Sequence, residues 1–421
     1  MKKVYDVAVV GGGPIGSYTA YQLAGRGFKV CVLDEKKIIS EGVICSGIIS
    51  KEAFRRFDLP RASILTDIDS FRVVSPGGQT LEYRHQSPFA HIVDREKFNE
   101  DIMEKAREKS AQIYLDHRVD RIDKTGDFYM ISHNGAVLQS KAVILATGIK
   151  YDLHAASGLG KPSKFLYGSQ TEIPLSMPIS TIEVHLGQSF APGSFGWIAP
   201  LHKDTSRVGV IAEEKGKHLL MRMLRERINY PASKIKINMI KSKPIVFGPI
   251  KPSVNGMLLA VGEAAGQVKT TTGGGIFFGL LCSEIAVDKL TATLKGKYVL
   301  NEYETAWRQA LHAELEIGME LRKIAGILGD KQVENLLSFI KKNPVLIKWI
   351  IPHIKYDFHS NFLLDCLKGF QSLLGSWQPK AFRNDDVTLL HVNSCLNSRP
   401  FAEKNLEPAF IPSGSWRNPL I

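Results

Sequence analysis

A glycine-rich turn near the start of the chain constrains the fold more than any other feature. Residues 4–10 form a short apolar run that predicts a buried parallel strand, and residues 15–26 have the pattern of a helix. A second apolar run, 28–33, predicts the next strand and ends at Asp34. The turn between the first strand and the helix has the spacing G-x-G-x-x-G, so these residues together predict one βαβ unit.

Each glycine of this turn has its own geometric role. Gly11 permits the tight turn, Gly13 lets the backbone approach a pyrophosphate, and Gly16 allows close packing of the helix on the strand. Free amides at the start of the helix attract phosphate. Asp34 follows about twenty residues later, where an acid accepts hydrogen bonds from a ribose. An ordinary glycine turn would need no such acid, so we expect the first 35 residues to bind the ADP half of a dinucleotide.

Bulk properties narrow the class of protein further. The 421 residues suffice for two or three domains, and the five cysteines form no C-x-x-C pair, which argues against a zinc site, an iron–sulfur cluster or a dithiol centre. We expect no metal site and a reducing, cytoplasmic location because the cysteines are scattered, and no signal peptide because MKKVYDVAVVGGG runs directly into a strand and a glycine turn. No run of about 18 apolar residues occurs, so we expect no membrane-spanning helix. A net charge of +12 suits a diphosphate, a dinucleotide or a phospholipid surface, although a merely basic surface explains it equally well. Nucleic acid is disfavoured, because the basic residues are dispersed.

The remaining patterns divide the chain into four parts. Residues 113–146 alternate as a small meander that returns to the parallel sheet, and residues 180–212 alternate as an antiparallel sheet. Helical spacing recurs at 97–107 and at 276–290. The predicted organisation is a discontinuous nucleotide-binding domain at 1–165 and 250–295, a substrate domain at 166–249, a helical region at 296–378 and an irregular tail at 379–421.

Four further segments carry a family resemblance. They are VDREKFNEDI, AVILATG, VGEAAGQVKTTTGGGIFFG, and a strand that fits P-x-x-Y-x-W-x-F-P with Phe195 for Tyr and Ala199 for Phe. With the βαβ unit, they resemble the geranylgeranyl reductase family of FAD-dependent oxidoreductases, particularly the archaeal-type enzymes that saturate prenyl chains of lipids. The resemblance covers residues 1–290. It implies an α/β fold with a Rossmann-type FAD-binding domain like that of p-hydroxybenzoate hydroxylase, an antiparallel-sheet substrate domain and a helical C-terminal region.

The resemblance also implies a set of FAD-binding residues. Glu263 stands where the family has an aspartate that holds the ribityl chain, and the helix that opens at Ile276 is aimed at the pyrimidine edge of the flavin, whose reduced form is anionic. Arg95 stands where related flavoproteins place an arginine near the cofactor. The implied set is Gly11, Gly13, Pro14, Ile15, Gly16, Asp34, Glu35, Ser46, Gly47, Arg95, Val119, Thr147, Gly148, Gly262, Glu263, Gly274, Gly275 and Ile276.

The substrate and catalytic residues also follow from the resemblance. Phe195, Trp197 and Pro200 match the prenyl-binding strand, whose alternate aromatic residues would point into one apolar pocket, although a core aromatic pair fits the pattern equally well. Cys45 lies in EGVICSGIIS, the cysteine loop that lies against the flavin in relatives. It is a candidate catalytic residue, with a small buried hydrophobe as the alternative.

We therefore expect an FAD-dependent reductase that saturates carbon–carbon double bonds of a prenyl lipid or prenyl diphosphate. The electron donor stays open between NAD(P)H, ferredoxin and reduced flavin, and the proton donor between solvent, Cys45 and another group. A hydroxylase on the same fold is disfavoured because ATGIKYDLHAASG lacks a D-G-x-x-S segment, and a halogenase because its W-x-W-x-I-P strand is only partly matched. A flavin-binding protein without activity also remains open.

One further segment bears on the membrane. Residues 333–370 alternate apolar clusters with lysines, a mixture typical of helices at a membrane surface. A helical cap packed on the substrate domain fits the same pattern.

Overall fold

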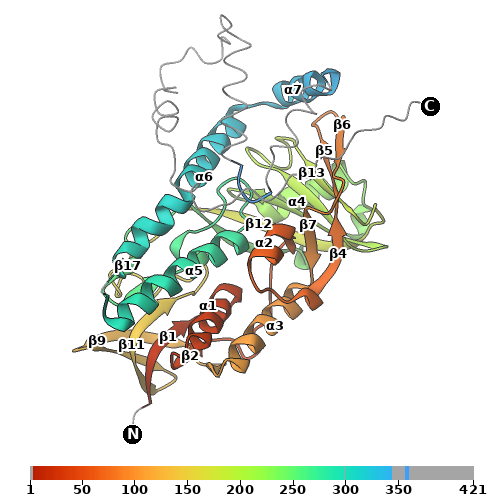
Figure 1. Ribbon diagram of the computed structural model, residues 1–421. Coiled ribbons are helices and arrows are strands. Elements are labelled where there is room, and N and C mark those ends of the chain that lie inside the picture. Colours follow the sequence, from red (N-terminus) through yellow and green to blue (C-terminus); the bar gives the residue numbers. More distant parts are fainter. Residues whose placement is uncertain (1–2, 298, 344–355, 360–421) are drawn as a thin grey trace, which may run out of the picture.

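The computed structural model describes residues 3–297, 299–343 and 356–359 as helices, strands and loops around three sheets (Figure 1). The helices are α1 (Pro14–Gly25), α2 (Lys51–Arg56), α3 (Arg95–Glu108), α4 (Gly216–Glu226), α5 (Ile276–Ala292), α6 (Glu302–Ile327) and α7 (Asp330–Lys342). The first sheet contains β1 (Val4–Val10), β2 (Val30–Leu33), β8 (Gln112–Tyr114), β9 (Val119–Thr125), β10 (Phe128–His133), β11 (Ala136–Leu145), β17 (Val254–Asn255) and β18 (Leu258–Ala260).

The other two sheets are built largely from antiparallel strands. The second contains β5 (Ser70–Val74), β6 (Thr80–Arg84), β12 (Lys164–Pro174), β13 (Thr181–His185), β14 (Gly196–His202), β15 (Thr205–Ala212) and β16 (Lys241–Phe247). The third contains β3 (Ile48–Ser50), β4 (Ile64–Ile68) and β7 (Ala90–Val93).

The first sheet has the predicted parallel core. β1 lies between β2 and β11, and both pairings are parallel. Strands covered on both faces are apolar along their whole length, which explains why β1 and β2 lack alternation. The predicted meander is β9, β10 and β11, and its last strand, β11, pairs in parallel with β18 from far along the chain.

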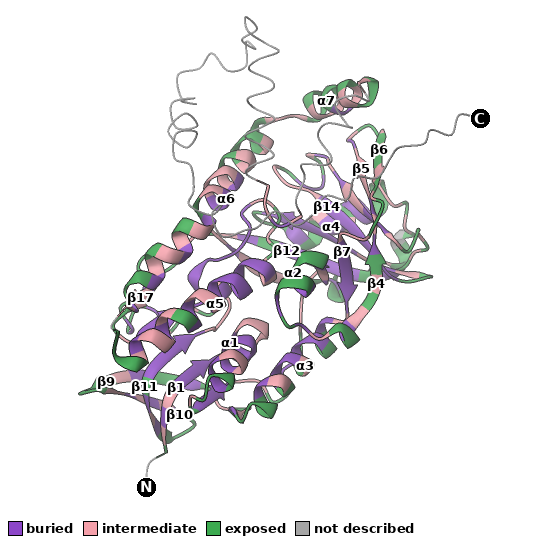
Figure 2. Ribbon diagram, viewed as in Figure 1, coloured by how far each residue is buried: buried purple, intermediate pink, exposed green. Residues whose placement is uncertain are grey.

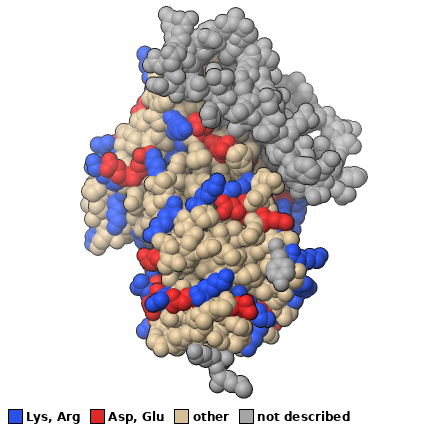
Figure 3. Space-filling model, turned by 90° about the vertical axis from the view of Figure 1, so that its left-hand side faces the viewer, with Lys and Arg blue, Asp and Glu red and all other residues tan. Residues whose placement is uncertain are grey.

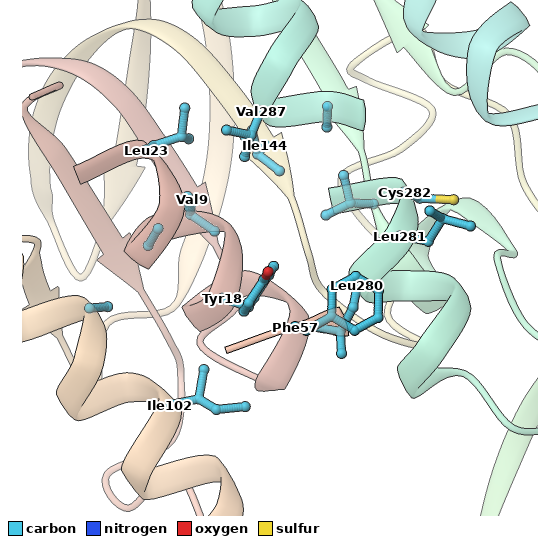
Figure 4. Close-up of a cluster of buried hydrophobic side chains, with 14 of the residues drawn as sticks. Val9, Tyr18, Leu23, Phe57, Ile102, Ile144, Leu280, Leu281, Cys282 and Val287 are labelled. Atoms are coloured by element: carbon cyan, nitrogen blue, oxygen red, sulfur yellow. The ribbon is translucent and has the colours of Figure 1, made fainter. Parts of the chain in front are cut away.

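Helices pack on one face of this sheet and form the larger core. Figure 4 shows Val9 and Ile144 of the sheet beneath Leu23 of α1 and Val287 of α5, all fully or almost fully buried. Burial is concentrated in β1, β7, β14 and α5, whereas α7 and the tip of β6 are mostly exposed (Figure 2). The meander packs on the other face of the sheet.

The ends of the helices follow local capping. The helix predicted at 97–107 begins earlier, at Arg95, because the Asp94 side chain accepts hydrogen bonds from the amides of Glu96 and Lys97. The helix predicted at 276–290 runs on to Ala292.

The second sheet takes strands from two distant parts of the chain. Its order is β16-β12-β15-β14-β13-β5-β6, and β5 pairs in parallel with β13. Residues 70–84 therefore belong to this sheet, although the sequence placed them in the nucleotide-binding domain that was expected to extend to residue 165. The pairing is long-range, and no local pattern encodes it. α4 packs on one face of the sheet, and the other face carries a separate apolar cluster that includes Trp197.

α6 connects the two larger parts of the structure (Figure 1). Near its start, Tyr303 donates a hydrogen bond to the carbonyl of Ala260 in the first sheet, at 2.7 Å. Near its end, the Arg322 guanidinium reaches the carbonyl of Gly193, beside the second sheet, at 3.4 Å. The helical region predicted at 296–378 is described only up to residue 343 and at 356–359, and the predicted tail at 379–421 lies outside the described residues.

Candidate functional site

One cavity of about 850 Å³ connects the glycine turn of the first sheet with the apolar face of the second sheet. Its wall is formed by the turn after β1, the end of β2, the loop that carries Cys45, the start of α5, and β13, β14 and β15 of the second sheet. Most of the residues implied by the resemblance lie along this wall, although they come from segments as far apart in the sequence as Gly11 and Ile276.

The three glycines of the turn have different surroundings. A Cβ on Gly11 would meet the carbonyl oxygen of Ala146 at 2.4 Å, and Gly11 has a positive φ of 102°. A Cβ on Gly16 would meet the carbonyl oxygen of Gly11 at 1.9 Å. A Cβ on Gly13 would meet nothing within 4 Å, and Gly13 lines the cavity. Packing therefore requires Gly11 and Gly16, whereas Gly13 leaves space for a ligand at the start of α1.

The acid at the end of β2 is held in place by backbone amides. Asp34 accepts hydrogen bonds from the amide of Gly12 at 2.6 Å and from the amide of Lys36 at 2.9 Å. Its neighbour Glu35 forms an ion pair with Lys150, which lies in the turn after β11. This arrangement fixes a carboxylate beside the glycine turn, at the place where a ribose would lie.

The turn after β11 closes this end of the cavity. Thr147 donates to the carbonyl of Lys150 at 2.7 Å, and Gly148 has a positive φ of 62°. Thr147, Gly148 and Val119 all line the cavity, as do Pro14 and Ile15 on the opposite side.

Arg95 is a buried cation with hydrogen-bonding capacity to spare. Its Nη2 donates to Asn99 at 3.0 Å and its guanidinium lies 4.8 Å from the ring centroid of Phe98, but Nε and Nη1 have no partner among the described residues. Burial lowers the pKa of Arg95, while Cys45 nearby opposes the shift. An unsatisfied buried donor is costly, so this cation on the cavity wall fits a ligand that supplies an acceptor.

Glu263 enters the cavity from the turn after β18. The turn requires Gly262, which has a positive φ of 67° and packs against Ile15 without lining the cavity itself. The Glu263 carboxylate accepts a hydrogen bond from Lys243 of β16 at 2.7 Å. Sequence reasoning missed Lys243, because β16 carries no motif.

The start of α5 forms the next part of the wall. Gly274, Gly275 and Ile276 line the cavity, and no side chain caps the helix. The helix end therefore presents free amides to a ligand.

The segment that carries the predicted aromatic motif, at the start of β14, lines the part of the cavity that lies against the second sheet. The rings of Phe195 and Trp197 lie edge to face with centroids 6.5 Å apart, and both line the cavity together with Phe71 and Phe89. Pro200 does not line it, since it lies buried farther along β14. The two aromatic residues are thus both core residues of the sheet and part of the cavity wall.

A single arginine joins the cysteine loop to the second sheet. Arg207 of β15 donates through Nη1 to the carbonyls of Cys45 at 3.1 Å and Ser46 at 2.9 Å, and it pairs with Glu172 at 2.7 Å. A Cβ on Gly47 would come within 2.8 Å of the same guanidinium. Cys45 and Ser46 line the cavity, so Arg207 holds a loop of the cavity wall in place. The sequence predicted that this loop belongs to the site, but it did not predict the contact with Arg207.

The C-terminal region contributes a wall that the sequence did not predict. Tyr356, Asp357 and His359 line the cavity, and Asp357 forms an ion pair with Lys269. No motif marks these residues, and the pair joins positions 88 apart. Within the described ranges, no group of three or more His, Cys, Asp or Glu side chains could hold a metal ion.

Comparison with known proteins identifies the relatives of this chain. A family model described as pyridine nucleotide-disulphide oxidoreductase matches residues 5–173. Digeranylgeranylglycerophospholipid reductase 1 of Methanococcoides burtonii is 27% identical over 81% of this chain and 88% of its own length. The digeranylgeranylglycerophospholipid reductase of Methanocaldococcus jannaschii is also 27% identical, over 80% of this chain and 90% of its own length. The resemblance to the geranylgeranyl reductase family is confirmed.

Solved structures show the same fold. A geranylgeranyl bacteriochlorophyll reductase-like protein of Thermoplasma acidophilum aligns with a TM-score of 0.74 at 20% identity, over 88% of this chain and all of that one. p-Nitrophenol 4-monooxygenase of Pseudomonas putida aligns with a TM-score of 0.64 at 18% identity, over 82% of this chain and 94% of that one. The predicted fold is therefore confirmed, and the family model together with the reductases named above confirms the oxidoreductase class.

Proposed function

We propose that this protein is an FAD-dependent reductase that saturates carbon–carbon double bonds in the prenyl chain of a lipid. The observation that carries the proposal is the continuous cavity, which begins at a phosphate-binding turn and ends in a chamber lined by aromatic and aliphatic side chains. Such a cavity suits a long dinucleotide whose reactive end meets an apolar substrate. The relatives named digeranylgeranylglycerophospholipid reductases support the same substrate class.

The residues on the wall fit the parts of FAD in order. The open face of Gly13 and the amides at the start of α1 would hold the pyrophosphate, and Asp34 would hold the adenosine ribose. Glu263 would hold the ribityl chain, and the start of α5 would face the flavin ring. The unpartnered donors of Arg95 supply a further contact.

The chain's own residues organise the reaction around the substrate. When bound and reduced by the electron donor, the flavin would supply the hydride for one alkene carbon, and a proton would have to reach the other carbon. Phe195 and Trp197 would align the prenyl chain of the substrate and exclude water. Arg207 holds the loop of Cys45 at the chamber, where the thiol is a candidate for positioning the alkene or passing the proton.

The partners outside the site follow from the same proposal. The substrate would be a prenyl lipid or a prenyl diphosphate, and NAD(P)H, ferredoxin or reduced flavin would supply electrons. None of the helices in the described ranges has the length and apolar character needed to cross a bilayer. A lipid substrate would therefore be reached from the membrane surface.

Residues 333–343 and 356–359 are the described part of the candidate membrane-binding segment 333–370, and α7 covers residues 333–342 of it. The helix has two faces. Glu334 binds the amide of Gly77 at 2.7 Å and Leu337 is buried, whereas Leu336 and Phe339 are 44% and 49% exposed. On the face of the molecule in Figure 3, basic and acidic side chains are interspersed and form no single positive patch.

The test is anaerobic incubation of the purified protein with a geranylgeranyl lipid and each candidate reductant, followed by mass spectrometry. The expected result is a gain of two hydrogen atoms for each saturated bond. A Gly13→Val protein, which should not hold FAD, is the matched control. A flavin-loaded protein that leaves the prenyl chain unchanged with every donor would refute the proposal, and an oxygenated product in air would favour a monooxygenase.

A further inference from the structure

A buried ion pair lies on the cavity wall and is not used by the proposed reaction. Lys269 Nζ lies 2.6 Å from Asp357 Oδ1, and the two side chains are 8% and 5% exposed. Lys269 also donates to the carbonyl of Tyr356 at 3.0 Å and lies 4.7 Å from the centroid of its ring. Asp357 Oδ2 has no partner among the described residues. Both members of the pair line the cavity.

The pair is fixed at the start of α5. The amide of Lys269 donates to the carbonyl of Gly274 at 3.0 Å, and the amide of Gly273 donates back to Lys269 at 2.8 Å. Phe358, which follows Asp357, packs edge to face on Phe277 in the first turn of α5, with centroids 5.5 Å apart. The charges therefore lie at the part of the cavity that would hold the flavin ring.

The titratable side chains His359 and Arg322 lie near this pair. Burial lowers the pKa of His359 to about 4, so this imidazole is neutral at pH 7. The Arg322 guanidinium donates to the carbonyls of Thr270 and Thr271, behind the same turn. Other charged side chains on the cavity wall come from other elements, among them Arg95, Glu183 and the Lys243–Glu263 pair.

Stability alone is a weak reason for such a pair. Desolvation of two charges offsets most of their attraction, and replacement of buried pairs by apolar residues is often neutral or stabilising. Buried charges that line a cleft are more often functional. A charge near a flavin changes the balance between its oxidised form and its more negative reduced form.

We propose that the Lys269–Asp357 pair sets the reduction potential of the bound flavin, with the lysine stabilising the reduced form and the aspartate limiting that effect. The inference rests on FAD binding, which the proposed function includes, and does not depend on the identity of the substrate. The direction of each effect is independent of which partner lies nearer the ring. Removal of a positive charge always disfavours the more negative reduced form, and removal of a negative charge always favours it.

The test is the midpoint potential of bound FAD, measured by equilibrium reduction against a reference dye without substrate. Lys269→Met should lower the potential and Asp357→Asn should raise it. The double variant, which has the same net charge as the wild type and no unpaired buried charge, should lie between the two single variants. Lys269→Arg keeps the charge and should stay near the wild type.

Two results would overturn this inference. In the first, both single variants bind FAD and show the same midpoint potential as the wild type. In the second, the midpoint potentials of both single variants shift in the same direction. If one single variant fails to fold, the other single variant still decides, because an unchanged potential, or a shift opposite to the one stated, contradicts the charge argument. Opposite shifts together with no reduction of prenyl lipids would instead support the inference and refute the proposed substrate.

Discussion

Replacement of Gly13 by valine separates ligand binding from folding at the glycine turn. Gly13 has φ −61° and ψ 178°, a backbone conformation open to valine, and its Cβ would meet no atom within 4 Å. The variant should therefore fold. The new side chain would project into the cavity where the pyrophosphate is expected, so FAD should be held away from the amides at the start of α1.

The size of the effect follows from the hydrogen bonds that this displacement removes. A hydrogen bond to a charged group contributes about 1.5–3 kcal/mol, so the loss of two phosphate contacts costs about 3–6 kcal/mol. Since each 1.4 kcal/mol is roughly tenfold in affinity, FAD should bind about 10²- to 10⁴-fold more weakly.

The assay is titration of apoprotein with FAD, followed by the change in flavin fluorescence, alongside thermal unfolding of the apoprotein. Gly25→Val at the other end of α1 is the matched control, because its Cβ would have no neighbour closer than 4.0 Å and Gly25 does not line the cavity. Unchanged FAD affinity in a folded Gly13→Val protein would refute the assignment of this turn to the cofactor.

The remaining predictions concern the aromatic residues of the cavity, a buried histidine and the membrane surface. Trp197→Ala should retain FAD and lose turnover of the prenyl substrate, whereas loss of both FAD and turnover would show that the ring serves only the core. Gly209→Ala should also reduce turnover, because its Cβ would meet the Trp197 ring at 2.1 Å and displace it. Burial lowers the pKa of His154, which contacts the carbonyl of Ala264 beside Glu263 at 2.9 Å. The folded protein gains stability from the neutral form of His154, and this contribution is complete above the ordinary pKa of 6.5 and is lost as the pH falls through the lower pKa of the folded state. The thermal stability should therefore drop below pH 6.5. The drop should be less steep in His154→Gln, which has no imidazole to protonate. More protein should sediment with anionic vesicles than with neutral vesicles at 0.1 M salt, and the difference should shrink towards 1 M as the screening length falls from about 10 Å to about 3 Å. Equal amounts of protein bound to both kinds of vesicle would exclude electrostatic binding to a membrane surface.

Local patterns in the sequence were enough to predict the parallel core of the first sheet and the glycine turn and acid that lie at one end of the cavity. The apolar run of β1, the glycine turn and Asp34 lie within 35 residues, and each has a requirement that only a few residue types meet. The meander and the helix at Ile276 were also visible, because their periodicity is local.

Some predicted features could not be located from local patterns. Phe195 and Pro200 belong to one motif, yet only Phe195 reaches the cavity, because burial depends on which layer covers each face of β14. β5 joins the second sheet across more than 100 residues, and alternation alone does not identify a strand's partner.

The sequence by itself determined that a turn with G-x-G-x-x-G spacing follows the first strand, and that the motifs of the chain resemble those of the geranylgeranyl reductases. Only the tertiary structure decided which side chains meet at the far end of the cavity. Arg207 reaches Cys45 from 162 positions away, and Asp357 reaches Lys269 from 88. The physical reason is that a glycine turn is specified by the conformations its own residues can adopt, whereas a buried ion pair or a clamped loop exists only once packing has brought distant segments together and removed water from between them.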